Sequence, residues 1–311
     1  MPAESTLPAR SNWLDASRDL LYSAVWRSAM KVDRWFGSIE PDVAYTQASG
    51  SIAPAVLWSQ YHGLQTELRF HADLPLPELN DELHAFIGRL NPTEFVAESQ
   101  PESGQLPNPF APSPQDQTIF GIQFSKPTGP GVRLDAGIGV PLSWPFNPYG
   151  KVGYLYALGE PQSGVLFWRQ DVFYQNSQGG FGVTNRIDLQ RLFGQYLLLG
   201  WTASTTVAQR SAGFASYSTL DAVVAFPNRR AIDIEAEIDG SSRAPVPLHD
   251  YGVKVAYRRS ILRDWLVLEI RTGVDYPKDY VWQRRAPSLG IGAGLEMYFG
   301  TYEFQARAVT F

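Results

Sequence analysis

The segment from Ala231 to Asp239 alternates one by one between apolar and charged residues. Isoleucine or alanine stands at positions 232, 234, 236 and 238, and aspartate or glutamate stands at 233, 235, 237 and 239. Because successive side chains of an extended strand point to opposite faces, the segment predicts a strand with one apolar and one charged face. The same alternation recurs from about residue 62 to residue 299. A closed barrel in a membrane, with lipid outside and a polar interior, best fits one large sheet of this kind.

Composition agrees with this fold and removes several others. The chain has no run of about 18 apolar residues, so a transmembrane helix is not expected. Aromatic residues make up 13% of the chain and 27 residues are glycine; membrane barrels use both at girdles and close strand contacts. Cysteine is absent, which removes disulfides and thiolate metal sites. The net charge of -5 argues against nucleic acid as a partner.

The alternating region divides into strands separated by residues typical of turns. We expect an all-β fold, a transmembrane antiparallel up-and-down β-barrel over residues 42–299 with about fourteen strands, 12 or 16 being the alternatives. Short turns, such as 76–81 and 127–130, alternate with longer connections, such as 92–116 and 240–249. The expected strands are 42–58, 62–74, 81–91, 117–126, 131–143, 150–159, 164–176, 180–191, 195–209, 213–226, 230–240, 250–259, 264–276 and 286–299.

This alternation of short and long connections resembles Gram-negative outer-membrane β-barrel proteins of the porin-like superfamily. Within the last strand, Gly294 is followed by spaced apolar or aromatic residues up to Phe299, similar to the C-terminal assembly signal of that family. The resemblance implies location in the outer membrane of a Gram-negative bacterium, with long external loops and short periplasmic turns. The expected partners are outer-membrane lipid and lipopolysaccharide. Residues 300–311 are expected to be a further strand or a tail.

The segment before the strands has helical spacing. We expect residues 1–10 to be a disordered N-terminus and residues 11–38 to form an amphipathic helix, in which Leu14, Leu21 and Val25 lie on one stripe. Such a helix could plug the lumen, cap its periplasmic mouth, bind a periplasmic protein or lie on the membrane surface, and all four roles stay open.

If the apolar residues face lipid, the charged residues between them line the lumen. Opposite charges alternate between neighbouring strands, so they could pair across the ladder or select solutes along a water-filled path. In particular, we expect the carboxylates of 233–239 to face Lys254 and Arg258. The predicted lumen-lining charged residues are Glu67, Arg69, Asp73, Arg133, Asp135, Arg186, Asp188, Asp233, Glu235, Glu237, Lys254, Arg258, Glu269, Arg271 and Glu296.

Two histidines could form a metal site in one hairpin. A tight turn near Pro77 would place His71 opposite His84 and Asp73 opposite Glu82. Two imidazoles and two carboxylates on the inner face could bind a divalent metal, with ordinary hydrogen bonding in the lumen as the alternative. No other cofactor is expected.

These features predict a channel or conduit for a small or amphiphilic substrate, without catalytic residues. The alternative is a barrel with a blocked lumen that acts as a scaffold and docks a periplasmic partner through residues 11–38. An outer-membrane enzyme is the least favoured hypothesis. The segment His-x-Ser-Asn-Gly of outer-membrane phospholipases is absent, and His249-Asp250 is the only adjacent histidine–aspartate couple.

Overall fold

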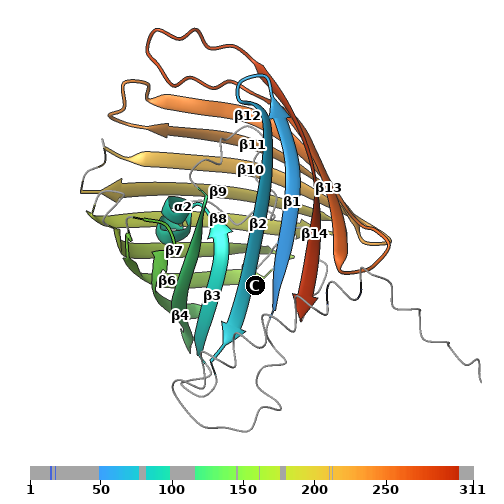
Figure 1. The fold of residues 1–311 in the computed structure, drawn as a ribbon. Helices are drawn as coiled ribbons and strands as arrows, with labels where there is room; N and C mark the ends of the chain where they lie inside the picture. The colour runs from blue at the N-terminus through green and yellow to red at the C-terminus, as the bar shows by residue number, and fades with distance from the viewer. Residues whose placement is uncertain are drawn as a thin grey trace, which may run out of the picture.

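Fourteen antiparallel strands form a closed barrel in the computed structural model, which describes residues 15, 18, 49–76, 82–98, 116–144, 146–160, 162–175, 180–209, 211 and 213–300. The first strand, β1 (Ser49–Ser59), pairs with the last, β14 (Ser288–Gly300), and the two lie side by side in Figure 1. Their pairing is interrupted at Ala53 and Pro54, and the proline nitrogen has no hydrogen to donate. Closure leaves the sheet without an open edge.

Every strand between these two pairs with its neighbours in the chain. The connections at one end of the barrel include the longest, 91–116 and 276–287, and this end is called the long-loop end. The other end is called the short-turn end. The strands are β2 (Gly63–Pro75), β3 (Leu83–Leu90), β4 (Gln117–Gly129), β5 (Val132–Pro141), β6 (Tyr149–Glu160), β7 (Gly164–Gln175), β8 (Gly180–Phe193), β9 (Leu197–Ala208), β10 (Ala215–Phe226), β11 (Arg230–Ser241), β12 (Leu248–Ser260) and β13 (Leu266–Asp275).

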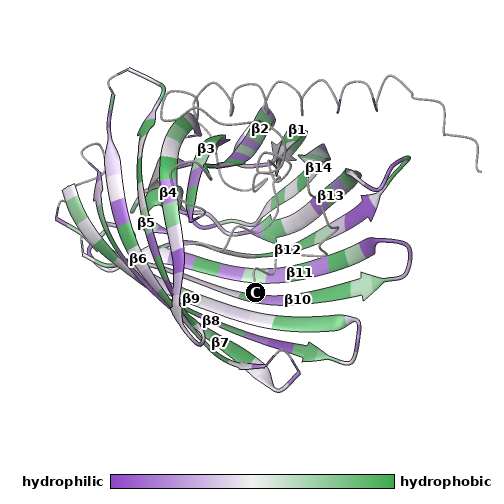
Figure 2. Cartoon of the chain, turned by 90° about the horizontal axis from the view of Figure 1, so that it is seen from below, coloured by the Kyte–Doolittle hydropathy of each residue, from purple (hydrophilic) through white to green (hydrophobic). Residues whose placement is uncertain are grey.

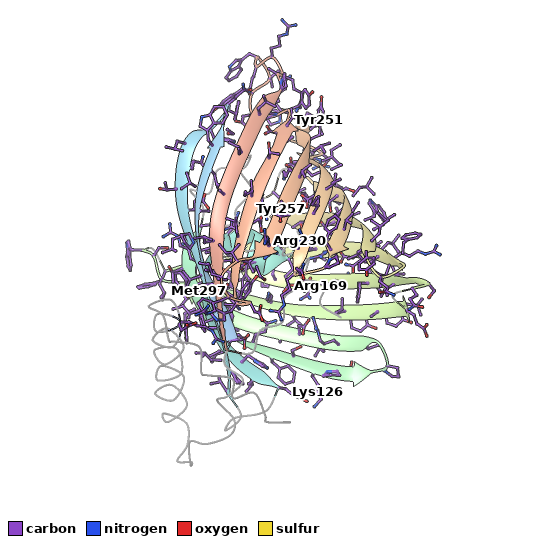
Figure 3. All side chains as sticks on the ribbon, turned by 90° about the vertical axis from the view of Figure 1, so that its right-hand side faces the viewer. Lys126, Arg169, Arg230, Tyr251, Tyr257 and Met297 are labelled. Carbon is purple, nitrogen blue, oxygen red and sulfur yellow. The ribbon has the colours of Figure 1, made fainter. Side chains whose placement is uncertain are left out.

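The two faces of the wall differ as the alternation predicts. In β7, Trp168 and Val172 point outward and are exposed, whereas Arg169 and Asp171 point inward and are buried. Hydrophilic and hydrophobic stretches alternate along β11, β12 and β13 in Figure 2, and the outward-facing Tyr251 of β12 is labelled in Figure 3. The outer face is therefore an apolar surface that needs lipid to cover it.

The all-β class, the closed antiparallel barrel and the fourteen strands are confirmed. Residues 42–48 of the first expected strand lie outside the described residues. The same holds for residues 1–10, for the tail after Gly300, and for the expected helix at 11–38 except Asp15 and Arg18. In the described part of the chain, no helix is long and apolar enough to cross a membrane.

Substitution of Ile234 by arginine should lower the free energy of unfolding by about 2–4 kcal/mol, because a charge would then face hydrocarbon from the middle of β11. Leu262→Arg is the matched control, since Leu262 is also apolar and exposed but lies in the turn between β12 and β13. Denaturant unfolding in lipid vesicles measures both variants. Equally small effects would contradict lipid contact at Ile234.

Candidate functional site: the lumen and the loop that enters it

All fifteen charged residues predicted to line the lumen lie on the inner face of the wall. Their positions alternate with exposed apolar residues on β2, β5, β8 and β11 to β14. Several are almost completely buried, including Asp135, Asp188, Glu235, Glu269 and Glu296. Buried charges need partners, and the inner wall supplies many of them as ion pairs between neighbouring strands.

Lys254 joins β12 to β11. Its ammonium lies 3.7 Å from a carboxylate oxygen of Glu235 and also pairs with Glu237. Glu235 stands directly opposite Lys254 in the ladder, so this part of the predicted pairing is right.

Arg258 instead joins β12 to β13 and β14. Its guanidinium lies 2.7 Å from Glu296 and 3.3 Å from Glu269. The prediction that Arg258 faces the carboxylates of β11 is wrong, because the residue opposite it there is Ala231, which carries no charge.

A short helix from the longest connection lies inside the barrel. α2 (Pro92–Ala97) follows β3 and packs against β6, β7 and β8 (Figure 1). Phe95 contacts the ring of Phe86 at a centroid distance of 5.1 Å and the ring of Tyr149 at 5.9 Å. Val96 and Ala97 are buried in the same apolar cluster. Apolar side chains on the inner wall therefore hold α2 in the lumen.

Glu98 follows this helix and ties it to two basic residues. Its carboxylate lies 2.6 Å from the guanidinium of Arg169 on β7 (Figure 3) and pairs with the ammonium of Lys151 on β6. Lys151 also donates a hydrogen bond to the carbonyl of Phe95 at 3.2 Å and lies over its ring at 4.1 Å. The helix end is thus fixed by charge as well as by apolar contact.

The backbone of Glu98 has a φ of 48°, in the left-handed region where glycine is usual after a helix. A non-glycine residue there costs roughly 1–2 kcal/mol. The two ion pairs of its carboxylate give a reason for glutamate at this position.

The environment of Glu98 keeps it charged. Burial raises the pKa of the Glu98 carboxyl, but the charges of Lys151 and Arg169 and the hydrogen bond from Lys151 outweigh burial and lower it below its ordinary value. The pair therefore persists throughout the neutral pH range.

The same connection is tied to the wall where it returns to the barrel. Asp116, just before β4, lies 3.0 Å from the guanidinium of Arg69 on β2. Both described ends of the connection are thus fixed to the inner wall, at β6 and β7 on one side and at β2 on the other. The helix α2, held at one of these ends, narrows the lumen beside β6 to β8.

The predicted opposition of His71 and His84 is wrong. In the ladder, His71 stands opposite Gly88, and His84 stands opposite Pro75. The connection between β2 and β3 is longer than a tight hairpin at Pro77 requires, so the register differs from the predicted one by an even number of residues. Both histidines therefore still point to the inner face. His84 lies 2.9 Å from Asp73 instead. Among the described residues, no group of three or more metal-binding side chains is arranged around one point.

Sequence reasoning missed Glu98, Lys151, Arg169 and Asp171. The last three stand among inward-facing aromatic residues such as Phe173, so their strands do not show a uniformly polar inner face. Strict alternation with Trp168 and Val172 was the available signal for Arg169 and Asp171. No sequence signal indicates the partners of Glu98, because these are set by how the connection folds back.

Two residues of the expected N-terminal helix touch the short-turn end. Asp15 accepts hydrogen bonds from Arg263 at 2.9 and 2.8 Å, in a paired geometry. Arg18 lies over the ring of Trp265 at 5.5 Å and donates to the carbonyl of Tyr298 at 3.3 Å. These contacts attach this part of the chain to the barrel rim.

A closed barrel of fourteen antiparallel strands, apolar outside and charged inside, has the fold of outer-membrane porins. Among solved structures, Pseudomonas putida OprB matches with a TM-score of 0.51 at 10% identity, over 82% of this chain and 94% of that one. The outer membrane channel DcaP of Acinetobacter baumannii matches with a TM-score of 0.50 at 10% identity, over 81% and 96%.

No protein-family model and no curated protein sequence matches the chain. The likeness is therefore one of fold. Together with the apolar outer face, it agrees with the expected location in an outer membrane.

Glu98→Gln should lower the free energy of unfolding at neutral pH by about 1.5–3 kcal/mol, the range for hydrogen bonds to charged groups. The difference from the wild type should disappear only at acid pH. Because the folded-state pKa of Glu98 is lowered, its stabilisation is complete above the ordinary glutamate pKa and is lost as pH falls through the lowered value. Thermal or denaturant unfolding against pH measures this.

Glu160→Gln is the control, since Glu160 is exposed at the short-turn end of β6. It should leave the unfolding free energy nearly unchanged at every pH. A difference for Glu98→Gln that stays constant down to strongly acid pH would contradict a charge-based tie.

Proposed function

We propose that the protein is an outer-membrane channel through which small or amphiphilic solutes pass along the barrel lumen. The observation that carries the proposal is the separation of faces in a closed wall of fourteen strands, with charged residues inside and apolar residues outside. A barrel of this size encloses more space than its own inward side chains fill, whereas eight strands are nearly filled. The fold, shared with OprB and DcaP, supports the same function.

The connection containing α2 and Glu98 supplies the narrow part of the proposed path. Its helix lies against β6, β7 and β8, so it occupies one side of the lumen. In the strand order β14 lies directly across the barrel from β7, so the charged inner face of β10 to β14 begins next to that side and extends to the far side. Solutes would pass between the helix and this charged wall.

Cysteine substitution tests the proposal sharply, because the chain has no cysteine of its own. Thr205 and Thr206 are neighbours on β9 that point to opposite faces: Thr205 is exposed on the outer face, whereas Thr206 points inward and hydrogen-bonds Thr184 at 2.9 Å. A charged thiol reagent should reduce single-channel conductance in planar bilayers for Thr206→Cys and leave that of Thr205→Cys unchanged.

The scaffold hypothesis makes the opposite prediction. A blocked barrel that docks a periplasmic partner should give no current, either as the full chain or without residues 1–38. Current through the full chain would reject it. Current only after removal of residues 1–38 would identify that segment as the plug. The absence of current from both folded proteins would overturn the channel.

A further inference from the structure

The inner wall of β10 to β14, here called the acidic wall, has a large excess of negative charge. It holds nine carboxylates and three basic residues. The carboxylates are Asp221, Asp233, Glu235, Glu237, Asp239, Asp250, Glu269, Asp275 and Glu296, and the basic residues are Lys254, Arg258 and Arg271.

The three basic residues are already engaged by glutamates. Lys254 pairs with Glu235 and Glu237, Arg258 with Glu269 and Glu296, and Arg271 with Glu269. The excess charge therefore lies mainly on the aspartates of the wall. Four of them, Asp233, Asp239, Asp250 and Asp275, form a series from the middle of β11 to the long-loop ends of β12 and β13.

Asp275 is the most informative of these aspartates. It is fully buried, at 0% exposure; Ser288 stands opposite it in β14, and no basic side chain among the described residues forms an ion pair with it. Gly252 stands opposite it in the ladder; a Cβ on that glycine would come within 3.0 Å of Asp275. One carboxylate oxygen of Asp233 has no hydrogen-bond partner among the described residues.

The opposite wall does not offset this charge. On the inner faces of β5 to β8, Asp135, Asp171 and Asp188 stand with four basic residues, and Glu98 brings the acidic residues to four. With Glu98 counted, the described charges on that side sum to zero. The basic residues there are Arg133, Lys151, Arg169 and Arg186.

A buried carboxylate without a basic partner is costly, and in a water-filled lumen a cation from the solution can supply the missing positive charge. A channel lined by one sign of charge concentrates mobile ions of the opposite sign and repels the others. The geometry points to a channel selective for small cations, inorganic or organic, with the acidic wall as the surface that selects them. This inference rests on the proposed channel function.

The reversal potential in planar bilayers tests it, with different concentrations of potassium chloride on the two sides. The reversal potential of the wild type should be shifted from zero toward the equilibrium potential of potassium. This preference for potassium over chloride should weaken as the salt rises from 0.1 to 1 M, because the screening length falls from about 10 to about 3 Å. A reversal potential at zero, or one shifted toward the equilibrium potential of chloride, at low salt would overturn cation selectivity without contradicting the channel function. Absence of current would overturn both.

Two substitutions locate the effect on the acidic wall. Asp233→Asn and Asp275→Asn should each reduce the ratio of potassium to chloride permeability by about twofold, the effect of one partly screened charge. Asp264→Asn is the matched control, because Asp264 is exposed and pairs with Arg229 at the short-turn end, outside the lumen. An unchanged ratio in both wall variants, or an equal change in the control, would overturn the assignment. If Asp275→Asn does not fold, Asp233→Asn and the salt dependence decide the question.

Discussion

The need to pair every backbone amide governs this structure. Within lipid, an unpaired N–H or C=O has no water to bind, so a sheet that crosses the membrane must close on itself. Here closure depends on β1 and β14, which are joined from Ser49 opposite Gly300 to Ser59 opposite Gly290. The pairing tolerates Pro54 because it skips that position and because β1 remains continuously paired with β2 on its other side. Once the wall is closed, each strand has one face toward lipid and the other toward the lumen.

The inner face is shaped by glycine as much as by charge. Gly153, Gly200 and Gly252 stand opposite Asp171, Asp221 and Asp275, respectively, in neighbouring strands. A Cβ on Gly153 would lie 2.2 Å from Asp171, and one on Gly200 would lie 2.1 Å from Asp221. The missing side chain leaves room for the carboxylate to lie along the wall instead of across the lumen. The wall can therefore carry many charges and still leave space for a path.

Strand positions could be predicted from the sequence, because a period of two follows directly from the need for two different faces. Register could not, because the same period is kept when a strand slides by an even number of residues. This is why His71 and His84 were correctly placed on one face but wrongly placed opposite each other. Arg258 shows the same limit. The alternation predicts that it points inward, but it does not predict that Arg258 pairs with Glu269 and Glu296, because that depends on uncharged Ala231 standing opposite it in β11. The tie of Glu98 to Arg169 joins residues brought together only by the fold.

The distribution of charge favours the side of the lumen that α2 and Glu98 occupy, in addition to the apolar contacts of the helix. Without Glu98, the inner faces of β5 to β8 have one basic residue more than acidic ones, whereas the acidic wall of β10 to β14 has six more carboxylates than basic residues. Glu98 is attracted to the first surface by Lys151 and Arg169 and would be repelled by the second. The same charge pattern that fixes the connection thus leaves the acidic wall facing the path. Glu98 neutralises the inner face of β5 to β8, whereas the acidic wall stays negatively charged. The lumen therefore carries a net negative charge.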